Sequence, residues 1–374
     1  MHSTILNRNK SKKDYTEILL KMEEKEVKLK KYLCVILISV VCISMVAVLL
    51  LSGCKTAAET TAAETTAAET TAAETTAAET TAAAEKEYTI GIVLKSFVDP
   101  FWLMADAGAK AKAKELGVNV IILSISAETA YEEQVAKTED IATQDIDLLV
   151  IVPAEASAIL PVVESIVDSG IPVIILDSPL GSEKTISFIG SDNVVGGAMA
   201  GEYIAKQLNG EGKVAVIRGM LGNPVELERY EGFTGKIAEY PGIEIVSEGV
   251  ANWETDKGYT VMEDILTANP DIQAVFGECD SMILGASGAA EAAERDDIIL
   301  VGLDGIVDAL RAVRDHTISA DVAQRPDLMG SYAVEKGLEY LKTGKIEKVI
   351  HTPLTLAVPD NVDPLIKAWE ELGF

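Results

Sequence analysis

The chain has 374 residues and a formal net charge of −27, with 32 Lys and Arg against 59 Asp and Glu. This length provides for two domains of ordinary size with their own cores, so that folding requires no disulfide or metal. The acidity argues against a nucleic-acid-binding protein, because phosphate binding needs a basic face, and with four Cys and three His we expect neither a metal site nor a cofactor.

The charge is divided unevenly along the chain. Residues 1–53 hold nine basic and five acidic residues, which leaves 23 basic and 54 acidic residues after them, a net charge of −31. Within this basic head, an uncharged apolar run extends from residue 32 to residue 51 and ends in Leu51-Ser52-Gly53-Cys54. A basic region, an apolar region and small residues before a cleavage point are typical of a secretory signal. We therefore predict an export signal over residues 1–53.

The end of the apolar run resembles the lipoprotein box of bacterial export signals. The resemblance implies that Cys54 carries a lipid, becomes the mature N-terminus and anchors the protein to the membrane. An uncleaved transmembrane helix is the alternative, because the run is about as long as the ~20 residues that span a bilayer. Both interpretations place the rest of the chain outside the cytoplasm. Met22 is a second candidate for the start of the chain.

Residues 54–86 are predicted to form a stalk behind the lipidated Cys54. Thr-Ala-Ala-Glu-Thr occurs five times over residues 56–80. A period of five matches neither a heptad nor a helical turn, so no apolar stripe forms. A solvated coil of this length spans on the order of 30 Å, which is enough to hold a domain away from a membrane. The threonine pairs are candidates for glycosylation.

From residue 88 onward, short apolar runs alternate with helical stretches. The first series predicts strands over 88–95, 118–123, 148–152, 173–176 and 186–190, with helices over 100–116, 132–143 and 157–169. The second predicts strands over 214–217, 243–247, 274–276, 298–303 and 318–323, with helices over 194–208, 226–239, 257–268, 282–293 and 307–314. Such alternation implies βαβ units and parallel sheets. Two series over about 290 residues predict an α/β protein of two doubly wound lobes.

Ligands in open α/β sheets bind beyond the carboxyl ends of the strands, so the residues that follow strands are the candidates for a binding site. Aromatic residues make up only 5% of the chain, which makes rings at strand ends informative. The candidates are Asp99, Phe101, Trp102, Asp177, Ser178, Arg229, Trp253, Cys279, Asp304 and Gln324. Asp280 also follows a strand, and we expect it to cap a helix or to join the two lobes.

Six segments, in this order along the chain, resemble the ribose/galactose-type periplasmic sugar-binding proteins of ABC importers. They are Asp-Pro-Phe-Trp, Val-Ile-Ile-Leu-Asp, Gly-Ser-Asp-Asn with Gly196-Gly197, Arg-Tyr-Glu-Gly-Phe, Val-Gly-Leu-Asp-Gly and Ala-Gln-Arg-Pro-Asp, and they cover about residues 88–356. The resemblance implies two lobes that close on one sugar about a three-crossing hinge. Crossings near Ser191-Asp192, Gln324-Arg325 and Thr352 give lobe 1 residues 87–191 and 325–352, and lobe 2 residues 192–324 and 353–374.

A sugar has apolar C–H faces and polar edges, and the candidates fit both. The three rings can cover the faces, the aspartates can accept bonds from hydroxyls, and Arg229 can donate a fork of N–H groups. Each candidate also has a structural explanation: Asp99 as the N-cap of the helix behind Pro100, Phe101 or Trp102 as a staple of that helix, Asp304 in a turn and Arg229 as a surface helix residue. The interpretation as a sugar-binding site therefore depends on all of these residues lying together at strand ends.

Three departures from the ribose-binding pattern bear on the ligand. Ribose-binding proteins carry Asn where this chain has Asp99, Arg where it has Ser178 and Asn where it has Cys279. The cleft is therefore more acidic, and a buried carboxylate needs hydrogen-bond donors. Asp99 with Trp253 resembles the galactose/glucose branch instead. We expect a hexose rather than ribose, with polyols and amino sugars as open alternatives.

The expected function is a monomeric, lipid-anchored binding protein outside the cytoplasm that delivers a simple sugar, hexose or pentose, to the membrane permease of an ABC importer, without catalysis. A sugar or polyol sensor for a chemoreceptor or signalling partner is the alternative. A glycosidase using two cleft aspartates is a weaker one, since the chain has no nucleophile elbow, P-loop or zinc motif. A sugar-responsive repressor would need a basic helix-turn-helix where this chain has its signal and acidic stalk.

Overall fold

The computed structural model describes residues 86–374. The predicted export signal, Cys54 and nearly all of the predicted stalk lie outside the described residues. Among the helices of residues 86–374, none combines the length and the apolar character that a membrane span requires.

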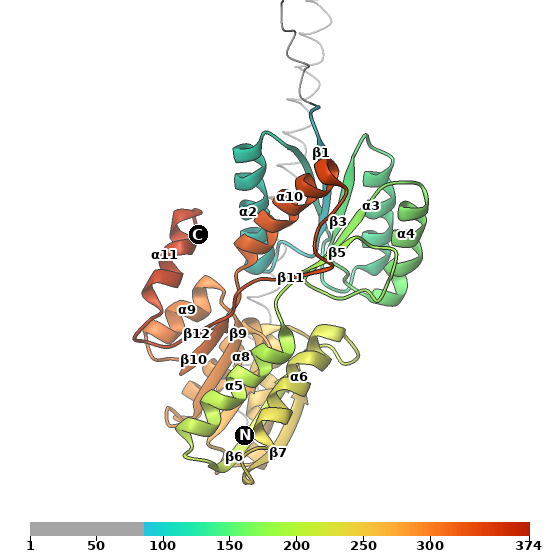
Figure 1. Ribbon diagram of the computed structural model, residues 1–374. Coiled ribbons are helices and arrows are strands. Elements are labelled where there is room, and N and C mark those ends of the chain that lie inside the picture. Colours follow the sequence, from blue (N-terminus) through green and yellow to red (C-terminus); the bar gives the residue numbers. More distant parts are fainter. Residues whose placement is uncertain (1–85) are drawn as a thin grey trace, which may run out of the picture. The chain divides into compact units, whose positions relative to one another are not determined.

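The first of two sheets has six parallel strands in the order β11-β5-β4-β3-β1-β2. The strands are β1 (Thr89–Leu94), β2 (Asn119–Ser124), β3 (Leu148–Ile151), β4 (Val173–Leu176), β5 (Ser187–Gly190) and β11 (Val349–His351). Helices α2 (Pro100–Leu116) and α10 (Pro326–Thr343) cover one face, and α3 (Tyr131–Ala142) and α4 (Ala156–Asp168) cover the other (Figure 1). Every residue of β3 and β4 is buried, as expected for strands covered on both faces.

The second sheet also has six strands, in the order β12-β10-β9-β8-β6-β7. The strands are β6 (Glu211–Arg218), β7 (Gly242–Val250), β8 (Ala274–Gly277), β9 (Ile299–Asp304), β10 (Ala320–Ala323) and β12 (Thr355–Ala357), the last antiparallel to β10. Its helices are α5 (Asn193–Gln207), α6 (Pro224–Ile237), α7 (Thr255–Ala268), α8 (Asp280–Ala292), α9 (Val307–Arg314) and α11 (Asp363–Glu371). The predicted fold class, two lobes each built on a parallel α/β sheet, is confirmed.

Lobe 1 is the unit built on the first sheet and lobe 2 the unit built on the second. The chain passes between them after β5, after β10 and after β11, where the next element belongs to the other lobe. At the first and last of these crossings, the hydroxyl oxygens of Ser191 and Thr352 lie 3.1 Å apart and are buried. This hydrogen bond ties two hinge segments together, so they are expected to move as one.

Helix α10 was not among the elements predicted from the sequence. It packs against α2 so closely that a Cβ atom on Gly330 would lie 1.9 Å from the carbonyl oxygen of Ala105. Close helix packing requires small residues, and these weaken the contrast between an apolar and a polar face. The alternation of apolar and polar residues in this helix is therefore weak, although the helix covers one face of the first sheet.

The contact between α5 and α6 is equally close and fixes the helix that carries Arg229. A Cβ atom on Gly197 would lie 2.0 Å from the carbonyl oxygen of Arg229. We expect Gly197→Ala to lower the free energy of unfolding by roughly 1–3 kcal/mol, because two backbones must separate to admit the methyl group. Urea unfolding of the full-length protein measures this change. Gly235→Ala on α6 is the matched control, since nothing lies within 4 Å of its Cβ position, and it is expected to stabilise slightly. Equal effects of the two substitutions would contradict this account.

Candidate functional site

A cavity lies between the lobes at the carboxyl ends of their strands. Nine of the ten candidate residues line it, and Ser178 does not. The lining residues are Lys95, Asp99, Phe101, Trp102, Glu128 and Asp177 from lobe 1, Asn223, Val225, Arg229, Trp253, Cys279 and Asp304 from lobe 2, and Gln324 from a hinge segment. The sequence reasoning had therefore missed Lys95, Glu128, Asn223 and Val225.

Asp99 caps a helix and also lines the cavity. It is the N-cap of α2, and its Oδ1 accepts a hydrogen bond from the backbone N–H of Phe101 at 2.9 Å. The same side chain lines the cavity, and burial raises the pKa of its carboxyl group. The cap bond uses Oδ1, so Oδ2 is available to a ligand. Pro100 at the first helical position then places Phe101 and Trp102 beside the cavity.

Lys95 is the main residue that the sequence reasoning missed. Its Nζ donates to the hydroxyl of Ser178 at 3.0 Å and lies 3.9 Å from carboxylate oxygens of both Asp177 and Glu128. Glu128 in turn accepts a 3.2 Å bond from Nε1 of Trp102. Ser178 therefore supports Lys95 from behind instead of facing the ligand. Strand β1 ends at residue 94, and the sequence prediction had extended it through Lys95, which hid a strand-end residue.

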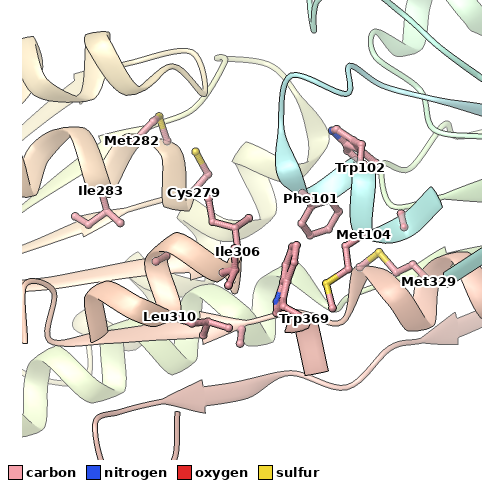
Figure 2. Packing of buried hydrophobic residues seen from close by; sticks show 14 of the residues in the cluster. Phe101, Trp102, Met104, Cys279, Met282, Ile283, Ile306, Leu310, Met329 and Trp369 are labelled. Carbon is pink, nitrogen blue, oxygen red and sulfur yellow. The ribbon is translucent and has the colours of Figure 1, made fainter. Parts of the chain in front are cut away.

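Aromatic rings stand on both sides of the cavity. Phe101 and Trp102 form an edge-to-face pair with centroids 4.9 Å apart, and Figure 2 shows Phe101 directed toward Ile306 and Trp369. Trp253 belongs to lobe 2 and has a φ of 69°, a left-handed conformation that is uncommon for a bulky residue. Its ring lies against Gly219, where a Cβ atom would come within 2.1 Å of it. This contact holds the indole at the cavity wall.

Arg229 is the centre of the polar wall of lobe 2. It is 3% exposed, so the alternative of a surface helix residue is wrong. Its Nε donates to Oδ1 of Asn193 at 3.0 Å, and Nη1 donates to the carbonyl oxygen of Glu278 at 2.5 Å. Its Nη2 lies 3.0 Å from Oδ1 of Asp304. Three fixed bonds orient the guanidinium without rotational freedom.

Gln324 joins this wall to the hinge. Its Nε2 donates to Oδ1 of Asp304 at 2.8 Å, whereas its Oε1 is buried without a hydrogen-bond partner. Burial raises the pKa of Asp304 to about 8, although the charge of Arg229 acts in the opposite direction. Burial also raises the pKa of the Cys279 thiol. The thiol is therefore neutral and lacks the thiolate character of a nucleophile.

Asp280 neither caps α8 nor joins the lobes, so both expectations for it were wrong. The N-cap of α8 is Cys279. Oδ2 of Asp280 accepts a 2.8 Å bond from the backbone N–H of Ile306 in its own lobe, and its carboxyl group lies near that of Asp321, around the Cβ position of Gly302. Both residues are fully buried, and burial raises the pKa of each. The pair supports the loop behind Asp304 from inside the lobe.

Glu278 is a buried acid directly beneath the site. It is 0% exposed, and its Oε2 accepts a bond from the N–H of Gly219 at 2.7 Å. Burial raises its pKa to about 8, with Glu226 raising it further and the charges of Arg229 and Arg218 lowering it. The native state therefore binds this proton more tightly than the unfolded chain does. The contribution of Glu278 to stability is therefore expected to be complete below about pH 4.5 and to be lost as the pH rises through about 8.

Ionisation of Glu278 is expected to lower the free energy of unfolding of the wild type between pH 5 and pH 8.5. Glu278→Gln is expected to make this decrease smaller, by up to roughly 4 kcal/mol. Urea unfolding at the two pH values measures the difference. Asp304 and Asp321 also have raised pKa values and leave a residual dependence. Glu254→Gln, at an exposed position, should keep the wild-type pH dependence. An unchanged pH dependence in Glu278→Gln would show that Glu278 is already ionised at neutral pH.

No group of three or more His, Cys, Asp or Glu among residues 86–374 has the arrangement to hold a metal ion. The groups around the cavity are aromatic rings, carboxyl groups, two amides, a thiol, an ammonium and a guanidinium. This combination can enclose a small polyhydroxylated molecule between apolar faces. It contains no activated nucleophile.

The comparisons with known proteins agree on one family. Residues 90–346 match the model of the periplasmic binding protein domain. A ribose import binding protein of Bacillus subtilis is 38% identical over 73% of this chain and 88% of its own length. A periplasmic solute-binding protein of an ABC transporter from Actinobacillus succinogenes, solved with bound D-allose, superposes with a TM-score of 0.72 at 27% identity, covering 74% of this chain and all of that one. A solute-binding protein from Bacillus halodurans, with bound myo-inositol, gives 0.70 at 28% identity, covering 75% and 98%.

Proposed function

Because the chain belongs to the periplasmic binding protein domain family, we propose that it captures a simple sugar, hexose or pentose, and delivers it to the membrane permease of an ABC importer. The site is the cavity between the lobes, and the protein acts outside the cytoplasm as a monomer. The single observation that carries this proposal is the cavity itself, in which aromatic rings of both lobes and four carboxylates surround one small space. Such a site matches the faces and edges of a monosaccharide.

The relatives support a binding role without catalysis. Those named above are an import binding protein and two solute-binding proteins with D-allose and myo-inositol bound. The neutral thiol of Cys279 supports the same role. Delivery to a sensory partner instead of a permease remains the alternative, and it would use the same cavity.

A thermal-shift panel of pentoses, hexoses, polyols and amino sugars tests sugar binding. The full-length protein is kept in a detergent without a sugar head group, and its unfolding is followed by tryptophan fluorescence. A ligand that binds only the native state stabilises it by about 2.7 kcal/mol at a hundred times its Kd. We expect at least one compound to raise the melting temperature by several degrees. If none does, the sugar-binding proposal fails.

We also propose that Cys54 carries the lipid that anchors the protein to the cell membrane, at the cell surface or in the periplasm. Metabolic labelling with an alkyne fatty acid is expected to mark the wild-type protein and to be lost in Cys54→Ala. Cys279→Ala is the control, because that thiol is buried in lobe 2 and should leave the labelling unchanged. Labelling that persists in Cys54→Ala would contradict the lipid anchor. Membrane attachment without any labelling would favour the uncleaved transmembrane helix.

A further inference from the structure

Some of the hydrogen-bond donors of the cavity are used within the protein. Lys95 donates to Ser178, Trp102 to Glu128 and Gln324 to Asp304. Arg229 directs its Nε and both terminal nitrogens to protein acceptors. Four of the N–H-bearing side chains that line the cavity are thus held in place by protein oxygens, while Lys95, Arg229 and Gln324 each keep at least one further N–H, as do the amide of Asn223 and the indole of Trp253.

The acceptors of the cavity are, by contrast, largely free. The hydrogen bonds of the described residues use Oδ1 but not Oδ2 of Asp99, and Oδ1 but not Oδ2 of Asp304. Asp177 accepts through Oδ2 alone. The clearest case is Oε1 of Gln324, an atom of a side chain only 3% exposed that has no partner. A buried acceptor without a donor costs free energy, so the cavity is built to receive donors.

The lining of the cavity has more acidic than basic side chains. Four acidic side chains line the cavity, those of Asp99, Glu128, Asp177 and Asp304, against the two basic side chains Lys95 and Arg229. The proximity of Asp99 adds to the burial that raises the pKa of Asp304, so carboxyl groups from opposite lobes repel each other across the space.

The outer part of the cleft continues the acidic lining. Glu254, Asp256 and Asp308 lie around its mouth together with Glu128. A cleft lined by one sign of charge attracts ligands of the opposite sign. The potential therefore favours the entry of a cation along the whole path from solvent to the cavity.

We propose that the ligand is an amino sugar, a monosaccharide in which an ammonium group replaces one hydroxyl, with the ammonium between Asp99 and Asp304. This inference rests on the proposed sugar-binding function and adds the charge of the ligand to it. An ammonium brings three donors, no acceptor and one positive charge. It therefore supplies donors to the free acceptors and a positive charge to the acidic lining. A neutral hydroxyl brings one donor, two acceptor lone pairs and no charge, so it leaves the excess of acidic side chains without a counter-charge.

Titration calorimetry of the full-length protein tests this proposal with matched compounds. D-glucosamine, D-galactosamine and D-mannosamine are each compared with the parent hexose and with the N-acetyl derivative, which keeps the nitrogen but removes its charge. At least one amine is expected to bind ten-fold or more tightly than both of its partners. Parent hexoses that bind as tightly as their amines in every pair would overturn the amino-sugar proposal and leave sugar binding intact. If no compound of either kind binds, the amino-sugar proposal is overturned, and the wider neutral panel decides whether sugar binding also fails.

Asp99→Asn tests the position of the charge. The amide oxygen of Asn can still accept the cap bond from Phe101, so α2 keeps its N-cap. The ratio of amine affinity to parent affinity is expected to fall at least five-fold. Asp145→Asn removes the same charge from an exposed position outside the cavity and should keep the wild-type ratio. A ratio that is unchanged in Asp99→Asn, with a melting temperature showing that the variant is folded, would overturn the placement. A fall of the same size in Asp145→Asn would mean that only the net charge of the protein matters.

Discussion

Arg229→Ala is expected to abolish sugar binding and to lower the free energy of unfolding by about 3–5 kcal/mol. The guanidinium is buried and holds Asp304, Asn193 and the carbonyl of Glu278 at once. Its removal leaves a buried carboxyl group without its cation and a cavity wall without its charge-assisted donors. Urea unfolding and calorimetry with the best compound of the panel measure the two effects.

Two further variants separate binding from folding. Arg229→Lys keeps the positive charge but not the planar fork, so it should fold better than Arg229→Ala and still bind at least ten-fold more weakly than the wild type. Arg314→Ala, at an exposed position paired with Asp315, should change stability by less than about 0.5 kcal/mol. Full affinity in Arg229→Lys and Arg229→Ala together would remove Arg229 from the binding site.

Asp177→Ala is expected to weaken sugar binding by about a hundred-fold or more. The carboxylate faces the cavity beside Lys95, at 3.9 Å, and is positioned by the hydroxyl of Ser178 at 2.8 Å. Hydrogen bonds from hydroxyls to a charged group contribute about 1.5–3 kcal/mol each, so losing two of them costs two or more decades in affinity. Calorimetry with the same compound measures the change.

The backbone at Asp177 calls for a second variant. Its φ is 63°, a left-handed conformation that Asp and Asn tolerate better than Ala. Asp177→Asn therefore preserves the backbone and one acceptor, and it should lose affinity while melting close to the wild-type temperature. If Asp177→Asn and Asp177→Ala both bind as the wild type does, the ligand does not contact this carboxylate.

The sequence predicted the elements around the site well, for a local reason. The predicted helix over 100–116 has the bounds of α2, and the predicted strand over 173–176 those of β4. Pro at the first turn, Asp before it and a left-handed Gly117 after the last turn mark the two ends of α2 through neighbouring residues alone. Buried strands can likewise be predicted from unbroken apolar runs in the sequence.

The same local signals failed where a residue's role depends on a distant partner. Lys95 and Glu128 are ordinary charged residues at strand ends, and only the fold brings them to Trp102 and Asp177. Asp280 follows its strand as a ligand-facing residue would, yet it turns inward to Asp321, 41 positions later in the chain. Helix α10 was hidden because three of the residues on its buried face, Gly330, Ala333 and Gly337, are small and weaken the apolar pattern.

By itself, the sequence determined the α/β class, the alternation of two similar lobes and the set of strand ends from which the site is made, because apolar periodicity and capping are properties of neighbouring residues. The tertiary structure alone decided which polar atoms are already bonded to protein and which remain for a ligand. Ser178 accepts a bond from Lys95, Arg229 donates to three protein oxygens, and Oε1 of Gln324 is free. Hydrogen-bond partners and burial depend on residues brought together across two lobes, and the charge balance of the cavity follows from them.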